Sequence, residues 1–125
     1  MFIRFKSGST WQVVGSDNFA GLIGSSVVGV VFSEYALSDP SSWSYLQPIL
    51  EENGGWALFI STTRGRNHFT RLVDFAKLEP GWFGQTLTVE DTKSIPLDRI
   101  DNHRRNLAAE RGDAEADAII EIGRA

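Results

Sequence analysis

The strongest apolar pattern in the chain is the valine-rich run Val27–Phe32, which stops at Ser33 and Glu34. A short, continuous apolar run bounded by turn residues is typical of a strand that is covered on both faces, as in a parallel sheet. The β-branched valines favour a strand over a helix. In open α/β sheets the ligand lies beyond the carboxyl ends of such strands, so Glu34 is a candidate catalytic or metal-facing carboxylate. Because ordinary strands also often end in an acid, a purely structural role for Glu34 stays open.

A second apolar run, Trp56–Ser61, predicts another buried strand, and the residues between the two runs predict a helix. Asp39 and Pro40 suit the start of this helix, and Asn53-Gly54-Gly55 suits its end. Pro48 is expected to kink the helix or to split it. Helical spacing places the following apolar residues on one buried stripe: Trp43, Leu46, Ile49 and Leu50.

A helical crossover of this kind joins parallel strands, whose carboxyl ends then lie on one side of the sheet. Glu34 and the pair Ser61 and Thr62 should therefore face the same crevice. A carboxylate that orients a water and a hydroxyl that senses a terminal phosphate are the groups that a nucleotide hydrolase needs.

The remaining segments predict smaller elements around this centre. Phe2–Lys6 and Thr10–Val14 alternate like the strands of a hairpin, the first of them half-buried. Further elements are expected as a short helix at Phe19–Ile23, a helix from Asn67 or Thr70 to about Leu78, a third strand at Trp82–Val89, a charged helix at Leu97–Arg111 and a last short helix through Ile119, Ile120 and Ile122. The expected architecture is an α/β layered fold with a central, mainly parallel sheet and peripheral C-terminal helices.

Composition narrows the function. The chain has 125 residues, enough for one domain or part of one, a net charge of -4 and no cysteine. The negative charge excludes a protein that binds nucleic acid through its overall electrostatics, so any DNA contact would be local. The absence of cysteine excludes disulfides and thiolate metal sites. No apolar run is long enough to span a membrane, and the N-terminus lacks the apolar core of a secretory signal.

A second candidate site follows the Trp56–Ser61 strand, where a basic loop precedes the helix near Asn67. Arg64 and Arg66 flank Gly65 in this loop. Free N–H groups at a helix N-terminus attract anions, and the two arginines add positive charge, so a phosphate or a DNA backbone is a possible ligand. The alternative is a solvated loop with surface arginines.

These segments together resemble the large terminase subunit of tailed bacteriophages, the ATP-driven motor that packages DNA into capsids. The resemblance extends to about Ile120. It is carried by the hairpin and loop from Ser7-Gly8-Ser9 to Leu22-Ile23-Gly24, by Val30-Val31-Phe32-Ser33-Glu34-Tyr35-Ala36, by Pro40–Trp43 with Leu46–Leu50 and Gly54-Gly55, and by Phe59–Phe69. The second of these is similar to the Walker B segment of the family and the last to its coupling motif.

The resemblance implies a partial P-loop NTPase-like fold of the ASCE type, with residues 1–92 as the C-terminal half of the ATPase domain and residues 93–125 as a charged tail toward a nuclease domain. It implies that Glu34 is the catalytic glutamate and that Ser61 and Thr62 belong to the coupling motif. Ser33 stands where the family usually has an aspartate, so it would hold Mg²⁺ weakly, through a water. Thr63 replaces a common proline.

The resemblance further implies ATP and Mg²⁺ as cofactors and double-stranded viral DNA, the portal and the small terminase subunit as partners, in the cytoplasm of a bacterial host cell. No Gly-x-x-x-x-Gly-Lys-Ser/Thr sequence is present. The chain alone is therefore not expected to bind ATP tightly or to hydrolyse it.

Two further expectations follow. The alternative to a fragment of a packaging motor is a prophage remnant or interaction module without ATPase activity. In addition, the Val27–Phe32 strand should keep an unpaired edge and an uncovered face, which favours self-association.

Overall fold

The computed structural model describes residues 1–22 and 26–112. The chain divides into two compact units, and the boundary along the sequence lies between Ile60 and Ser61. The predicted last helix through Ile119, Ile120 and Ile122 lies outside the described residues. The expected division at residues 92 and 93 concerns a larger protein and stays a prediction.

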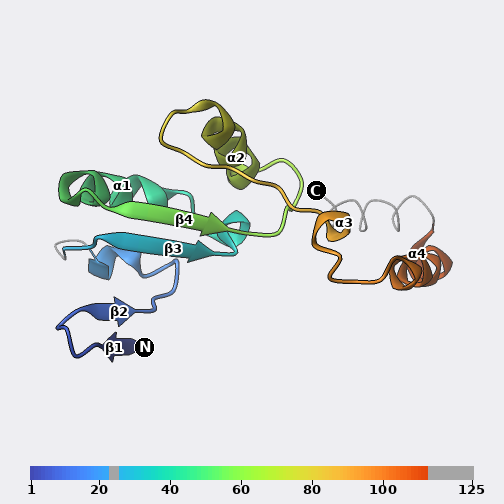
Figure 1. Cartoon of the computed structure of the whole chain (residues 1–125), viewed down its shortest axis with the longest axis horizontal. Coiled ribbons are helices and arrows are strands. Elements are labelled where there is room, and N and C mark those ends of the chain that lie inside the picture. Colours follow the sequence, from blue (N-terminus) through green and yellow to red (C-terminus); the bar gives the residue numbers. More distant parts are fainter. Residues whose placement is uncertain (23–25, 113–125) are drawn as a thin grey trace. The chain divides into compact units, whose positions relative to one another are not determined.

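The first unit contains a hairpin and a β-α-β crossover (Figure 1). In the hairpin, β1 (Phe2–Arg4) pairs antiparallel with β2 (Thr10–Gln12), as predicted. The expectation of a half-buried first strand is wrong, because every residue of both strands is exposed. The expected short helix is a 3-10 turn, η1 (Phe19–Leu22).

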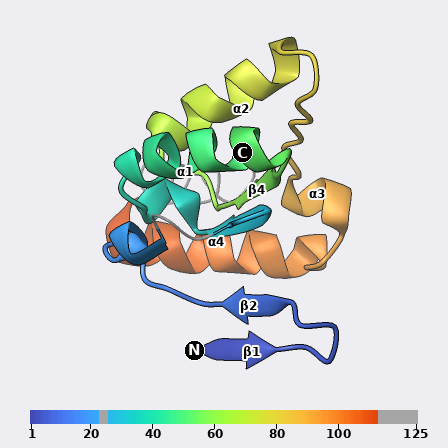
Figure 2. The same cartoon turned by 90° about the vertical axis from the view of Figure 1, so that its left-hand side faces the viewer.

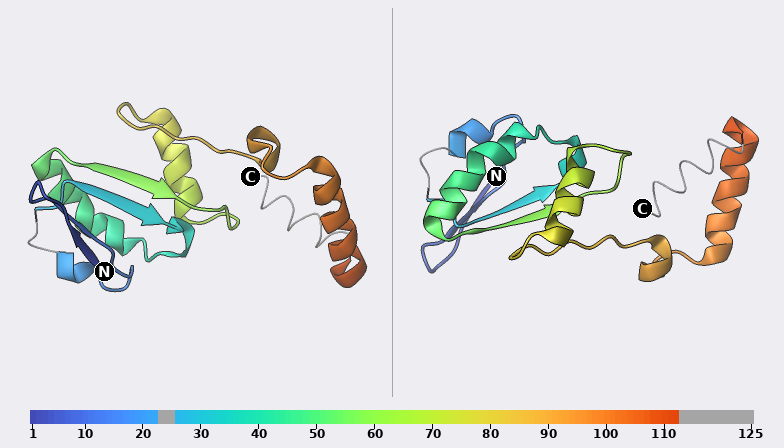
Figure 3. Two further views of the ribbon diagram at one scale, coloured as in Figure 1. Left: turned by 60° about the horizontal axis from the view of Figure 1, so that its bottom comes forward. Right: turned by 90° about the horizontal axis from the view of Figure 1, so that it is seen from above.

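The crossover consists of β3 (Gly29–Ser33), the 3-10 turn η2 (Tyr35–Leu37), α1 (Ser41–Asn53) and β4 (Trp56–Ile60). The two strands are parallel, as predicted, and their paired positions run from Gly29 with Trp56 to Ser33 with Ile60. They form a two-stranded sheet. The arrows of β3 and β4 point the same way in both views of Figure 3.

Burial on both faces, expected for these two strands, is not found. One face packs against α1 (Figures 1 and 2), through Phe32, Phe59 and Trp43. The Phe32 and Phe59 rings stack with centroids 5.0 Å apart, and Trp43 meets Phe59 edge-on at 5.0 Å. The other face exposes Val31, Trp56, Leu58 and Ile60. The uncovered face that the sequence predicts is therefore present.

Helix α1 begins and ends as its sequence predicts. Pro40 already has helical dihedrals, and a carboxylate oxygen of Asp39 accepts the Ser41 N–H at 2.9 Å. At the other end Gly54 adopts the left-handed conformation, with φ 62°, and the Gly55 N–H donates to the Leu50 carbonyl at 2.7 Å. Leu46 and Leu50 form the centre of the buried stripe.

Pro48 does not split α1, which runs unbroken from Ser41 to Asn53. Pro48 and Ser44 both lie on the exposed side of the helix. The Ser44 carbonyl, which loses its intrahelical donor at Pro48, can therefore bond to water, so the proline removes one hydrogen bond without breaking the helix.

The second unit contains α2 (His68–Leu78), α3 (Val89–Thr92) and α4 (Leu97–Arg111). The helices at α2 and α4 agree with the prediction. The predicted third strand at Trp82–Val89 is wrong, because residues 82–88 form no ladder. Trp82 instead packs edge-on against Phe75 of α2, with ring centroids 5.5 Å apart, so this segment pairs with a helix rather than with a strand. Among the described residues, no helix is both long enough and apolar enough to cross a membrane.

The junction between α1 and β4 depends on Gly55. A Cβ atom there would lie 2.7 Å from the Val28 carbonyl oxygen and 2.8 Å from the Leu50 Cδ2 atom. We expect Gly55→Ala to lower the free energy of unfolding by about 1–3 kcal/mol, because the backbone of Val28 cannot move aside without disturbing β3. Urea denaturation measures the change. Gly21→Ala is the control, since a Cβ there meets nothing within 4 Å. Equal stability of the two variants would contradict the prediction.

Candidate functional site

The candidate site begins where the two parallel strands end. Ser33 and Ile60 are paired residues at the carboxyl ends of β3 and β4 (Figures 1 and 3). Glu34 directly follows Ser33, and Ser61 directly follows Ile60. Ser61 is the first residue of the second unit. The strand register is therefore the observation that relates Glu34 to Ser61, and the crevice that they are expected to share stays a prediction.

Glu34 occupies an unusual backbone conformation. Its φ of 53° and ψ of 47° lie in the left-handed region, which side-chain-bearing residues rarely adopt. Its carbonyl accepts the Leu37 N–H at 2.9 Å, which closes the η2 turn. Ser33 and Glu34 are both exposed. The turn therefore ends the strand sharply and leaves the hydroxyl and the carboxylate at the surface.

Tyr35 anchors this turn in the core. Its side chain is only 3% exposed, and its ring meets Phe32 at 5.1 Å and Phe59 at 4.8 Å, both edge-on. Burial, with a smaller contribution from the negative charge of Asp39, raises the pKa of the Tyr35 phenol above its usual value. Glu34 is thus held at the surface, because exposing the neighbouring Tyr35 side chain to water would cost free energy.

The hydroxyl residues after β4 lie outside any helix or strand. The Ser61 hydroxyl donates to the Thr62 carbonyl at 3.0 Å. Thr62 is exposed, whereas Ser61 and Thr63 are half-buried. Nothing in this geometry assigns a ligand to Ser61 or Thr62, so their role in coupling stays a prediction.

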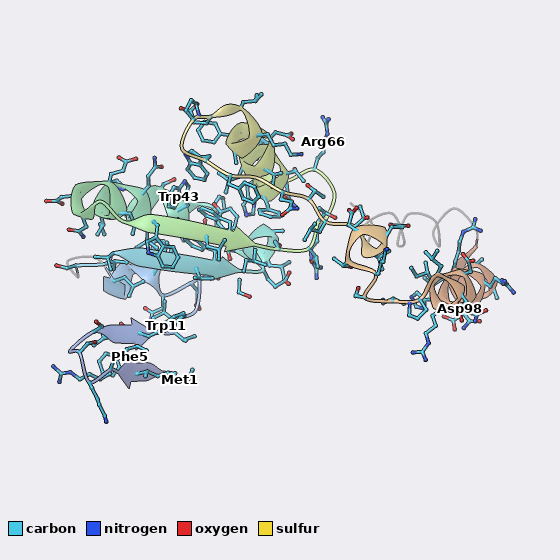
Figure 4. All side chains as sticks on the ribbon, in the orientation of Figure 1. Met1, Phe5, Trp11, Trp43, Arg66 and Asp98 are labelled. Atoms are coloured by element: carbon cyan, nitrogen blue, oxygen red, sulfur yellow. The ribbon has the colours of Figure 1, made fainter. Side chains whose placement is uncertain are left out.

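The basic loop leads directly into α2, whose N-terminus is fully capped. The Asn67 side chain accepts the N–H groups of Phe69, at 2.9 Å, and Thr70, at 3.3 Å, while the Thr70 hydroxyl accepts the Asn67 N–H at 2.9 Å. This reciprocal pair is a capping box. Arg64 and Arg66 are exposed, and Arg66 extends from the loop in Figure 4. The cap uses the N–H groups that an anion would need, so any anion contact would depend mainly on the two arginines.

The site offers an incomplete set of donors for a metal. Among residues 1–22 and 26–112, no three carboxylate, histidine or cysteine side chains gather in a metal-binding group. Mg²⁺ commonly takes one or two carboxylates and completes its shell with water and substrate phosphates. Ser33 and Glu34 supply one hydroxyl and one carboxylate, which fits a metal held mainly by a nucleotide but does not form a cage.

Sequence reasoning missed the contribution of Tyr35. The signal was present, because an aromatic residue directly after an acid at a strand end is well placed to turn back into the core. The left-handed conformation of Glu34 had no sequence signal at all, since glutamate does not favour it.

Comparison with known proteins gives one informative similarity. The large terminase subunit of Escherichia phage T5 is 30% identical to the chain over 125 aligned positions, which cover 94% of this chain and 28% of that protein. The chain thus spans little more than a quarter of the relative that it matches. No family model and no solved structure matches it. The similarity supports a relation to terminase large subunits and leaves the Walker B and P-loop NTPase assignments as predictions.

The cap of α2 can be tested by removing its acceptor. We expect Asn67→Ala to lower the free energy of unfolding by about 1 kcal/mol, because two N–H groups lose their partner. Amide hydrogen exchange at Phe69 and Thr70 should become faster. Asn67→Asp is the matched control, since its carboxylate accepts the same bonds and suits a helix N-terminus. Unchanged exchange in Asn67→Ala would show that water replaces the cap without loss.

The burial of Tyr35 predicts a dependence of stability on alkaline pH. The pKa of Tyr35 in the folded chain is raised above the ordinary tyrosine value of 10.0, so the phenol of the unfolded chain ionises first. The free energy of unfolding should therefore be unaffected well below pH 10.0 and should fall as pH rises through that value. Tyr35→Phe should abolish this fall. Tyr45→Phe is the control, because it alters an exposed tyrosine and retains Tyr35. Urea denaturation at a series of pH values measures the free energy of unfolding, and the ultraviolet absorbance of tyrosinate follows the ionisation. An identical fall in the free energy of unfolding of the wild type and both variants would refute the assignment.

Proposed function

We propose that the chain is a segment of a terminase-like large subunit and contributes the water-activating half of its ATPase site. The observation that carries the proposal is the parallel register of β3 and β4, which ends at Ser33 and Ile60. A carboxylate and a hydroxyl follow these paired positions. The similarity to the phage T5 protein supports the same conclusion from an independent direction.

In this proposal Glu34 acts as the general base. Its carboxylate accepts a proton from the water that attacks the terminal phosphate of ATP, and the left-handed turn keeps it at the surface where the nucleotide would lie. Ser33 would hold Mg²⁺ through a bound water. When bound, the metal neutralises charge on the phosphates.

Ser61 and Thr62 form the coupling segment of the proposal. They connect β4 to the loop that contains Arg64 and Arg66. Strand β4 is itself paired with β3, which Glu34 follows. When the Ser61 and Thr62 hydroxyls gain or lose their contact with the terminal phosphate of ATP, this loop would move. Arg64 and Arg66 would then contact the backbone of double-stranded DNA. The intact motor would work with a portal and a small terminase subunit in the cytoplasm of a bacterial host cell.

The chain alone lacks a phosphate-cradling sequence, so it should not hydrolyse ATP. The decisive experiment mixes the purified chain with a second polypeptide that supplies a phosphate-cradling Gly-x-x-x-x-Gly-Lys-Ser/Thr loop and measures phosphate release. We expect activity only in the mixture, reduced at least 100-fold by Glu34→Gln, which keeps shape but cannot accept the proton.

Glu52→Gln is the matched control, because Glu52 is an exposed residue near the end of α1 and lies outside the site. It should retain full activity. Hydrolysis by the chain alone would contradict the expectation that it is inactive by itself. Equal activity of the two glutamine variants would refute the assignment of Glu34.

A second function, that of an interaction module without ATPase activity, is favoured by one specific observation. The exposed face of the β3–β4 sheet presents Trp56, Leu58 and Ile60 to solvent. A chain that has lost its hydrolytic partner could persist as a binding module. Absence of activity in the mixture, together with a stable complex between the two polypeptides, would favour this alternative.

A further inference from the structure

One face of the β1–β2 hairpin is mainly apolar, whereas the opposite face carries Arg4 and Gln12 together with the exposed Phe2. Ile3 and Trp11 are paired residues, and the Val13 N–H donates to the Met1 carbonyl at 2.9 Å, which continues the pairing. Side chains alternate along a strand, so Ile3 and Trp11 share a face with Met1, Phe5 and Val13. These five side chains, here called the hairpin face, are between 47% and 80% exposed. Figure 4 labels three of them, Met1, Phe5 and Trp11.

The sheet of β3 and β4 has a second exposed apolar face. Val31 pairs with Leu58, Ser33 pairs with Ile60, and Trp56 pairs with Gly29. A Cβ atom at Gly29 would lie 2.5 Å from the Trp56 indole, so the indole lies directly over the glycine. Val31, Trp56, Leu58 and Ile60, here called the sheet face, are between 39% and 57% exposed.

Charge is distributed unequally between the hairpin and the rest of the first unit. Residues 1–60 contain two basic side chains, Arg4 and Lys6, and both belong to the hairpin segment. The five acidic side chains of residues 1–60 all follow the hairpin: Asp17, Glu34, Asp39, Glu51 and Glu52. Arg4 and Lys6 lie on the opposite side of the hairpin from Ile3 and Trp11. The attraction between the cationic hairpin of one molecule and the anionic remainder of another therefore guides their encounter rather than the contact itself.

We propose that two copies of this chain form a closed dimer in which the hairpin face of each copy covers the sheet face of the other. One chain carries both surfaces, so each copy offers the surface that its partner needs. The two identical contacts close a twofold arrangement. They leave neither the hairpin face nor the sheet face free to bind a further copy. The proposal concerns association only and does not depend on ATP hydrolysis.

The area available is sufficient for a stable dimer. Four or five large apolar side chains that are each about half exposed present roughly 300–500 Å², the size of a functional surface patch. Two reciprocal contacts cover four such faces and would remove roughly 1,200–2,000 Å² from water, which is the range of specific, stable interfaces. One contact alone would remove half of this area and would hold only weakly.

The dimer can be tested with the full chain by analytical ultracentrifugation over a range of concentrations. We expect a reversible monomer–dimer equilibrium without larger species. Trp11→Arg on the hairpin face and Leu58→Lys on the sheet face should each raise the dimer dissociation constant at least tenfold. Gln12→Arg is the matched control, because Gln12 lies on the opposite face of the hairpin and should retain the dimer. Circular dichroism establishes that each variant is folded.

Mixing the two disruptive variants gives the sharpest test. The Leu58→Lys hairpin and the Trp11→Arg sheet face are both intact, so the mixture should form a heterodimer with one good contact. This heterodimer should be weaker than the wild-type dimer but tighter than the dimer of either variant alone. A monomeric wild-type chain at every concentration would overturn the proposal. A dimer that Leu58→Lys disrupts and Trp11→Arg does not would also overturn it, because that result means that two sheet faces pack on each other.

Discussion

The structure of the first unit depends on the parallel pairing of β3 and β4 under α1. Parallel strands cannot be joined by a tight turn, so the chain must cross over through a helix, and that helix becomes the cover of one sheet face. Phe32 and Phe59, which are paired across the strands, stack with an interplanar angle of 4° and receive Trp43 from the helix and Tyr35 from the following turn. This aromatic cluster fixes the register, and the register fixes which residues emerge at the strand ends.

The sequence predicts local structure well at positions where a residue type has one main structural role. Asp39, Gly54 and Asn67 all mark helix ends correctly, because capping needs only neighbours in the chain. The prediction of a strand at Trp82–Val89 is wrong, because an apolar run has the same appearance in the sequence whether it packs against a strand or against a helix. The same ambiguity explains the predicted burial of both faces of β3 and β4, since a sequence records that a residue is apolar but not what covers it.

The candidate site was predictable in part for the same reason. Glu34 and Ser61 were placed at strand ends by pattern alone, and the register agrees with that placement. The conformation of the Glu34 turn depends on Tyr35 reaching back to Phe59, a contact between residues far apart in the chain, so no local pattern reveals it. The similarity to a terminase large subunit supports a relation, while the chemistry assigned to these residues remains our proposal.

The backbone of Glu34 gives this position an evolutionary meaning. A left-handed residue other than glycine costs roughly 1 kcal/mol, so glycine or asparagine would make the turn more stable than glutamate does. Most substitutions that improve the turn would also remove the carboxylate. Under the catalytic role that we propose for Glu34, selection for stability and selection for a carboxylate therefore favour different residues at this position. In a lineage released from the second pressure, Glu34 should be among the first residues of β3 and its turn to drift.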